Sequence, residues 1–239
     1  MLFFIISNIS APSNKSKLKL VSVKLYCLPA ALSKITARVH FVRYLYSAAV
    51  VIDVVVIDVL RATTAMCVAL ENGVEKIIPV SSLEEAEEYK RMGYLVGAER
   101  NGKIVKGFSF GNSPLGFYDE SFKGKTIVMT TTNGTRAINT ASRAKTVITA
   151  ALVNLDAVCK YLLAEKKNVL ILCSGWKDRF NLEDTICGGA IADYLLATGE
   201  FTSEHDSSVA AKYLYQSARD NYFGYLKSSS HRRRLKKLT

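Results

Sequence analysis

From about residue 50 onward, short apolar runs alternate with amphipathic stretches, and this alternation constrains the fold more than any other feature of the chain. The apolar runs are rich in valine and isoleucine and nearly continuous, which is typical of strands covered by helices on both faces. We expect strands at 50–59, 76–80, 94–96, 126–131, 146–149 and 169–173. We expect helices at 63–71, 83–92, 135–142, 156–166, 183–196 and 207–226. This order of elements predicts an α/β fold, a mostly parallel sheet with helices on both faces (α/β/α).

The 239 residues suffice for one large domain or two small ones. We expect three regions along the chain. Residues 1–49 form a divergent N-terminal segment, residues 50–226 form the α/β core, with room for two sub-lobes, and residues 227–239 form a basic, truncated and frayed tail. The loop at 97–118, with five glycines and one proline, interrupts the alternation, and long loops in compact domains are usually functional.

The net charge of +11 is concentrated at the two ends of the chain. Residues 59–218 carry 18 basic and 18 acidic side chains, so the body is neutral, and we expect no nucleic-acid partner. The five cysteines are scattered without a CxxC pair, which favours a reducing compartment. No apolar segment approaches the roughly 20 residues of a membrane span. We therefore expect a cytoplasmic protein without a membrane partner.

The first expected strand contains the pentapeptide VVIDV twice in succession, at 50–54 and 55–59. Because five is odd, Asp53 and Asp58 point to opposite faces of a continuous strand. Only Asp58 is followed by Leu-Arg-Ala-Thr-Thr, so we assign Asp53 to the divergent segment and Asp58 to the chemistry. An acid that ends a run of valines needs a partner or a metal, and Arg61 offers a planar fork for phosphate. The alternative is a plain turn in which Thr63 or Thr64 caps the helix.

Further polar clusters follow other expected strands, at the sheet edge where open α/β sheets bind ligands. The stretch 130–136 supplies threonine hydroxyls, Asn133 and Arg136, although a well-capped turn has the same composition. Glu99 and Arg100 begin the long loop and could instead form a surface ion pair. Asn112 and Ser113 can face a ligand once Phe108 and Phe110 anchor that loop.

A third cluster comprises Cys173, Ser174 and Arg179, followed by Glu183 and Asp184 at the start of a helix, where acids also favour the helix dipole. Cys173 or Ser174 at a strand end could act as a nucleophile. A nucleophile of this kind usually needs a base, however, and all three histidines lie in the flanks of the chain. We therefore favour a buried structural thiol at Cys173.

The expected crevice combines carboxylates with four arginines. Hard oxygen ligands suit Mg²⁺, which binds through one or two carboxylates plus substrate phosphate oxygens. Several arginines suit a ligand with more than one anionic group. The sequence contains no zinc-type Cys/His spacing, no Walker A loop and no GxGxxG after a strand.

These motifs resemble the 2-phosphosulfolactate phosphatase family. The resemblance is carried by IDVLRATT (57–64), GAER (97–100), GFSFGNSPL (107–115), TTTNGTRA (130–137) and RFNLEDTICGGA (179–190), five motifs in order. It is close from about residue 55 to 196 and weaker through 210–235, and KLYCLPA (24–30) looks like the first strand of the family. The resemblance implies an α/β/α enzyme that uses Mg²⁺ to hydrolyse 2-phospho-3-sulfolactate to 3-sulfolactate and phosphate, a step in making coenzyme M.

With this resemblance we assign roles to the candidate residues. The expected catalytic residues are Asp58, Arg61, Glu99, Asn133 and Arg136. The expected substrate-binding residues are Thr63, Thr64, Arg100, Asn112, Ser113, Thr135 and Arg179. The expected Mg²⁺ ligands are Asp58, Glu183 and Asp184. We expect Arg61 to serve the phosphoryl group, and Arg136 and Arg179 to serve the other acid groups of the substrate.

Three alternatives stay open: a phospho-aspartyl intermediate on Asp58, a phosphatase for another small phosphorylated hydroxy acid, and a non-catalytic anion-binding module. The first lacks the second aspartate of the haloacid-dehalogenase signature, because Leu60 occupies that position. The expected partner is a small anionic phosphate ester, and a homo-oligomer is compatible with a metabolic enzyme of this size.

Overall fold

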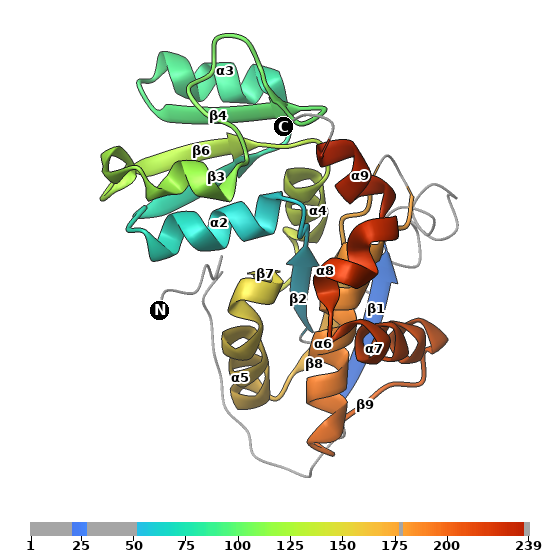
Figure 1. Cartoon of the computed structure of the whole chain (residues 1–239). Helices are drawn as coiled ribbons and strands as arrows, with labels where there is room; N and C mark the ends of the chain where they lie inside the picture. The colour runs from blue at the N-terminus through green and yellow to red at the C-terminus, as the bar shows by residue number, and fades with distance from the viewer. Residues whose placement is uncertain (1–20, 28–51, 177–178, 237–239) are drawn as a thin grey trace.

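The structure is a computed structural model of the whole chain, and it describes residues 21–27, 52–176 and 179–236. For the first of these ranges it describes the backbone alone. Figure 1 shows two sheets, one above the other, with helices between and around them. The strands are β1 (Val21–Cys27), β2 (Ile52–Ile57), β3 (Lys76–Val80), β4 (Leu95–Arg100), β5 (Lys103–Ile104), β6 (Thr126–Thr130), β7 (Thr146–Ala150), β8 (Asn168–Cys173) and β9 (Phe201–Thr202).

The larger sheet has five strands in the order β7-β2-β8-β1-β9, and all its pairings are parallel. The smaller sheet has the order β3-β6-β4-β5, with only β5 antiparallel. The α/β fold with mostly parallel sheets is therefore confirmed. β1 contains the KLYC of the expected first strand of the family and pairs with β8 in the middle of the larger sheet.

The helices lie in layers on either side of the sheets. They are α2 (Ala62–Glu71), α3 (Leu83–Arg91), α4 (Gly134–Ala141), α5 (Leu155–Glu165), α6 (Leu182–Ala197), α7 (Asp206–Ala218), α8 (Tyr222–Tyr225) and α9 (Ser230–Leu235). Short 3₁₀ turns occupy Pro114–Tyr118, Glu120–Phe122, Leu152–Asn154 and Leu226–Ser228. None of the helices in the described ranges is long and apolar enough to cross a membrane.

A shared apolar cluster joins the two sheets through α2 and α4. Val54 and Val56 of β2 and Met129 of β6 pack into it together with Met66 of α2 and Ile138 of α4. The opposite face of the larger sheet packs on α5, α6 and α7, and the outer face of the smaller sheet packs on α3. β2 and β8, in the middle of the larger sheet, are buried almost throughout, which is why each contains a long run of apolar residues.

The six expected strands and the first five expected helices all occur, with ends displaced by a few residues. The largest extension is in β4, which runs on to Arg100 because Gly97 and Ala98 pair with β6 and Glu99 pairs with β5. The single helix expected at 207–226 is wrong. Helix α7 ends at Ala218, and the Asn221 side chain accepts a 2.7 Å hydrogen bond from the Gly224 N–H to begin α8. A side chain that bonds its neighbouring backbone in this way favours a new helix start over a helix interior.

Asp53 is the second residue of β2, in agreement with the strand expected at 50–59. Its side chain is fully buried beside Lys167, with 3.8 Å between Oδ1 and Nζ. Asp58 follows the other end of the same strand. Residues 52–57 of the duplicated stretch thus form one continuous strand, with Asp53 near its start and Asp58 directly after its end.

The long loop is anchored as expected by its phenylalanines. Phe108 packs against the cluster beneath α3, and Phe110 packs against the cluster between the sheets. Phe110, Phe117 and Phe122 contact one another, with ring centroids 5.1–5.5 Å apart. A Cβ on Gly97 would lie 2.2 Å from the Phe110 ring, so only glycine lets the loop pack this closely on β4.

Candidate active site

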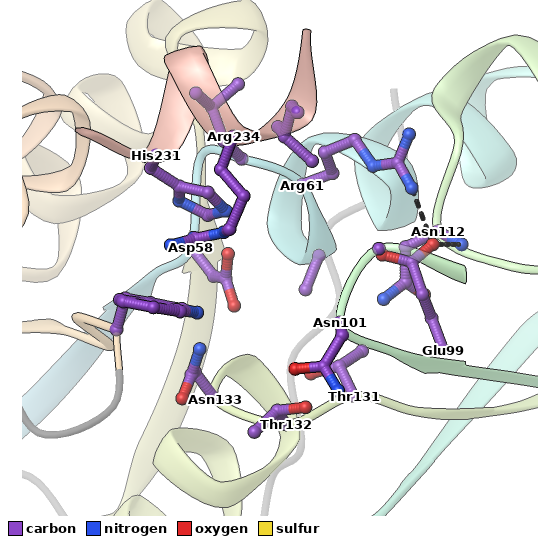
Figure 2. A pocket seen from close by; sticks show the side chains of 15 residues that line it. Asp58, Arg61, Glu99, Asn101, Asn112, Thr131, Thr132, Asn133, His231 and Arg234 are labelled. Atoms are coloured by element: carbon purple, nitrogen blue, oxygen red, sulfur yellow. Dashed lines mark hydrogen bonds and ion pairs between the residues drawn. The ribbon is translucent and has the colours of Figure 1, made fainter. Parts of the chain in front are cut away.

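A pocket opens at the carboxyl ends of β2, β4 and β6, where the two sheets meet, and α9 closes one side of it (Figure 2). Its walls come from five connections between elements and from α9. The lining residues are Asp58, Leu60, Arg61, Ala62, Glu99, Asn101, Gly102, Asn112, Thr131, Thr132, Asn133, Trp176, His231, Arg234 and Leu235. The expected residues Asp58, Arg61, Glu99, Asn112 and Asn133 are thus brought together.

Asp58 lies at the junction of β2 and α2. Its backbone N–H donates to Thr63 Oγ1 at 3.0 Å, and its carbonyl accepts from the Thr63 N–H at 2.9 Å, so the turn is tight. Burial raises the pKa of Asp58 to about 6, and the charge of Glu183 adds to this shift. The positive charge of His231 and hydrogen bonds from the Ala62 N–H and Ser174 oppose it. Burial thus outweighs these favourable contacts and makes the ionised form of Asp58 costly.

Asp184 lies directly behind Asp58, in the first turn of α6. Its Oδ1 accepts from the Val59 N–H at 2.8 Å, and its Oδ2 accepts from the Ser174 hydroxyl at 3.1 Å and the Gly175 N–H at 3.2 Å. Burial, together with the charges of Asp58 and Glu183, raises its pKa well above the ordinary value. Both oxygens are thus engaged in holding the strand ends, which differs from the expected role of metal ligand.

Glu183 also lies outside the pocket lining, fully buried, and binds the C-terminal part of the chain. Its Oε1 is 2.7 Å from His231 Nδ1, and its Oε2 accepts from the Ser229 hydroxyl at 2.9 Å. Burial would raise the pKa of Glu183, but the hydrogen bonds and the charge of His231 outweigh it and hold that pKa below its ordinary value. An ionised Glu183 accepts the Nδ1 proton, so His231 presents its Nε2 to the pocket.

The expected frayed tail is therefore wrong over residues 230–235, which form α9. Ser229 begins this helix by accepting a 3.3 Å hydrogen bond from the Arg232 N–H. α9 brings His231 and Arg234 into the pocket (Figure 2), and no motif in the sequence had indicated either residue. The only signal was a serine run before SHRRRL, which is typical of a helix start but says nothing of where the helix packs.

Arg61 and Glu99 face each other across the opening between the sheets. Arg61 Nη2 is 2.6 Å from Glu99 Oε2, and the same oxygen accepts from the Asn112 N–H at 2.8 Å. The surface ion pair considered for Glu99 and Arg100 is not what the structure contains. Arg100 instead donates to the carbonyl of Glu99 and to Thr130 Oγ1. Arg61 Nε and Asn112 Oδ1 are buried without a hydrogen-bond partner among the described residues, so each can bind a ligand.

The other expected substrate-binding residues and the expected catalytic residue Arg136 do not line the pocket. The hydroxyls of Thr63, Thr64 and Thr135 bond to the backbone of the turns that hold Asp58 and Asn133. Ser113 begins a 3₁₀ turn, and Arg136 and Arg179 are exposed. Cys173 is fully buried in the apolar cluster between the larger sheet and its outer helices, as a structural thiol is expected to be.

The described side chains provide few ligands for a metal on their own. Among them, no three His, Cys, Asp or Glu residues are arranged to hold a metal ion. Asp58 alone of the three expected ligands reaches the pocket. Burial is the main cause of its raised pKa, and a divalent cation beside it would favour the ionised carboxylate. Mg²⁺ fits such a site, because it binds through one or two carboxylates and takes its other ligands from water and phosphate.

The fold and this pocket define an α/β protein with a polar pocket at strand ends, one that combines arginines with a buried carboxylate. A sequence profile of the 2-phosphosulpholactate phosphatase family matches residues 44–239. The chain belongs to this family.

Curated relatives agree with this assignment. A probable 2-phosphosulfolactate phosphatase of Thermotoga maritima is 44% identical over 181 residues, which cover 76% of this chain and 77% of the relative. Proteins with the same description are 41% identical in Caldanaerobacter subterraneus subsp. tengcongensis, covering 78% of each chain, and 40% identical in Clostridium tetani, covering 78% of this chain and 80% of the relative.

Proposed function

We propose that this chain is a phosphatase that hydrolyses 2-phospho-3-sulfolactate to 3-sulfolactate and inorganic phosphate with the help of Mg²⁺. The observation that carries this proposal is the pocket itself, in which the buried carboxylate of Asp58 lies together with Arg61, Asn133 and His231. The identity of the substrate is inferred from membership of the family. The charged groups of the pocket match a small ester with several anionic groups.

Asp58 is the residue that would hold Mg²⁺. When bound, the metal supplies positive charge next to the phosphoryl oxygens. Glu183 and Asp184 support this site from behind, because they fix His231 and the backbone after β2. We assign them to positioning roles in place of direct metal binding.

The remaining pocket residues bind and orient the ester. Arg61 is held by Glu99 with its buried Nε still available to an anionic oxygen. Thr131, Thr132 and Asn133 line the pocket at the start of α4, beside Asp58. His231, held through Nδ1 by Glu183, offers Nε2 for a hydrogen bond to the substrate. Preorganised groups of this kind stabilise the charge that develops in phosphoryl transfer.

The test is release of phosphate from 2-phospho-3-sulfolactate by purified protein at saturating Mg²⁺. We expect turnover, its loss after treatment with EDTA and desalting, and its return when Mg²⁺ is added. Full activity after EDTA treatment would contradict the role of the metal. Binding without phosphate release would identify an anion-binding module, and faster release from another phosphorylated hydroxy acid would change the substrate assignment.

A further inference from the structure

Arg234 of α9 enters the pocket stacked on an aromatic ring. Its Cζ lies 3.4 Å from the centroid of the Trp176 ring system, and both residues line the pocket. Figure 2 shows the side chain extending from α9 into the cavity beside His231. A guanidinium stacked on an aromatic ring can still donate hydrogen bonds, because stacking involves the face of the group and its N–H bonds lie in the plane.

The charge of Arg234 lacks a carboxylate partner among the described residues. Its Nη2 is buried without a hydrogen-bond partner there. Burial lowers the pKa of Arg234, and Glu183 is the acid that opposes this shift. The two Glu183 oxygens already bind His231 and Ser229, so Glu183 does not satisfy the guanidinium. A buried donor on a cation without a partner carries a penalty that an anionic ligand would remove.

Hydrogen bonds hold the residues that support Arg234. The backbone N–H and carbonyl of Trp176 pair with those of Arg179 in two hydrogen bonds of 3.0 Å. α9 itself is fixed on Glu183 through the Ser229 hydroxyl and the His231 ring. Arg234 is therefore held in place before a ligand arrives, which lowers the entropy lost on binding.

The pocket thus contains the guanidinium groups of two arginines from different parts of the chain. Arg61 comes from the β2–α2 connection and is partly neutralised by Glu99, whereas Arg234 comes from α9 and stacks on Trp176. Each has one buried nitrogen without a partner among the described residues. Two separately supported forks match a ligand with two separate anionic groups.

We propose that Arg234, stacked on Trp176, binds one of the two acid groups that the substrate carries besides its phosphoryl group. Arg234 would thereby select esters with a second anionic substituent. Sulfonate and carboxylate both accept two parallel N–H bonds, and either can occupy this subsite. The inference rests on the proposed function. It replaces Arg136 and Arg179, which are exposed, in the role expected for them from the sequence.

The two reaction products test this subsite separately, because one contains only the phosphoryl group and the other only the acid groups. We expect Arg234→Gln to weaken inhibition by 3-sulfolactate about 10- to 100-fold, the range for a lost charge-assisted hydrogen bond. Inhibition by inorganic phosphate should change less than about twofold, because phosphate would not lose a hydrogen bond to Arg234. Arg234→Lys keeps the charge without the fork and should give an intermediate loss for 3-sulfolactate. Lactate and 2-hydroxyethanesulfonate, which each lack one acid group, show which of the two Arg234 binds.

Arg232 offers a matched control on the same helix, because its guanidinium also stacks on a ring, that of Phe223 at 4.1 Å, but lies outside the pocket lining. Arg232→Gln should leave both inhibition constants unchanged. An unchanged 3-sulfolactate constant in Arg234→Gln, or an equal or larger loss for phosphate, would overturn the proposal. If wild-type protein releases no phosphate, the proposed function fails, but calorimetric binding of 3-sulfolactate to wild type and Arg234→Gln still decides the role of Arg234.

Discussion

Gly134 places the start of α4 against Asp58, and its replacement by alanine should damage catalysis more than stability. A Cβ at this position would lie 2.7 Å from Ala62 Cβ and 2.8 Å from Asp58 Oδ2. Carbon atoms pack at about 3.5–4.0 Å, so one side must move by roughly 1 Å. Overpacking of this kind costs about 1–3 kcal/mol, and the better helix propensity of alanine offsets up to ~1 kcal/mol. The protein should therefore still fold.

The effect on activity should be larger, because the atom that has to move belongs to the carboxylate assigned to Mg²⁺. A displacement of about 1 Å in a reacting group costs on the order of 100-fold in rate. We expect Gly134→Ala to lower kcat by about this factor while Tm falls by only several degrees. Phosphate release and thermal unfolding, measured on the same preparation, separate the two effects.

A control and a partial rescue make the test specific. A Cβ on Gly116 would meet nothing within 4 Å, so Gly116→Ala should change neither kcat nor Tm. Adding Ala62→Gly to Gly134→Ala removes the contact between the two β-carbons but keeps the contact with Asp58. The double variant should recover at most part of the lost Tm, because glycine at position 62 itself costs about 1 kcal/mol in a helix, and it should stay low in kcat. Wild-type kcat in Gly134→Ala, or recovery of kcat in the double variant, would refute the reasoning.

Two further predictions concern the acids at the two ends of β2. Asp58→Asn should lower kcat at least about 100-fold, which is the scale of one lost preorganised contact. Asp53→Asn should leave kcat nearly unchanged. Equal losses of kcat in a steady-state assay would count against the assignment of the chemistry to Asp58. Burial, opposed by Lys167, raises the pKa of Asp53 above 3.8, so wild-type protein loses stability as the pH rises through that folded-state pKa. The Tm of Asp53→Asn relative to wild type should therefore increase from acid to neutral pH, and a flat or falling difference would contradict the burial effect.

The strands and helices of the core could be predicted because their signal is local. β2 and β8 are buried on both faces, so each contains a run of consecutive apolar residues, at 54–57 and 169–173, and the helices between them begin and end at recognisable residues. Asp58, Arg61 and Asn133 could be placed for the same reason, since strand ends in a parallel sheet meet at one edge.

What the sequence did not indicate depends on tertiary contacts. α9 has six residues, too few for a clear pattern, and it is fixed by Glu183, which lies 46 and 48 residues before Ser229 and His231. Arg136 follows a strand end just as Arg61 does, but it lies on an exposed face of α4. The position of a residue in the chain predicted which edge of the sheet it would approach. It did not predict where the side chain would point.

The pocket draws on both an early and a late part of the chain, and this has a consequence for protein synthesis. The strands of both sheets leave the ribosome before Ser229, His231 and Arg234 do. A nascent chain can therefore assemble its sheets and the Arg61–Glu99 pair while one wall of the pocket is still missing. The pocket is complete only after translation has passed α9, and a message cut short before that helix would yield a chain without His231 and Arg234 and with the buried Glu183 carboxylate unpaired.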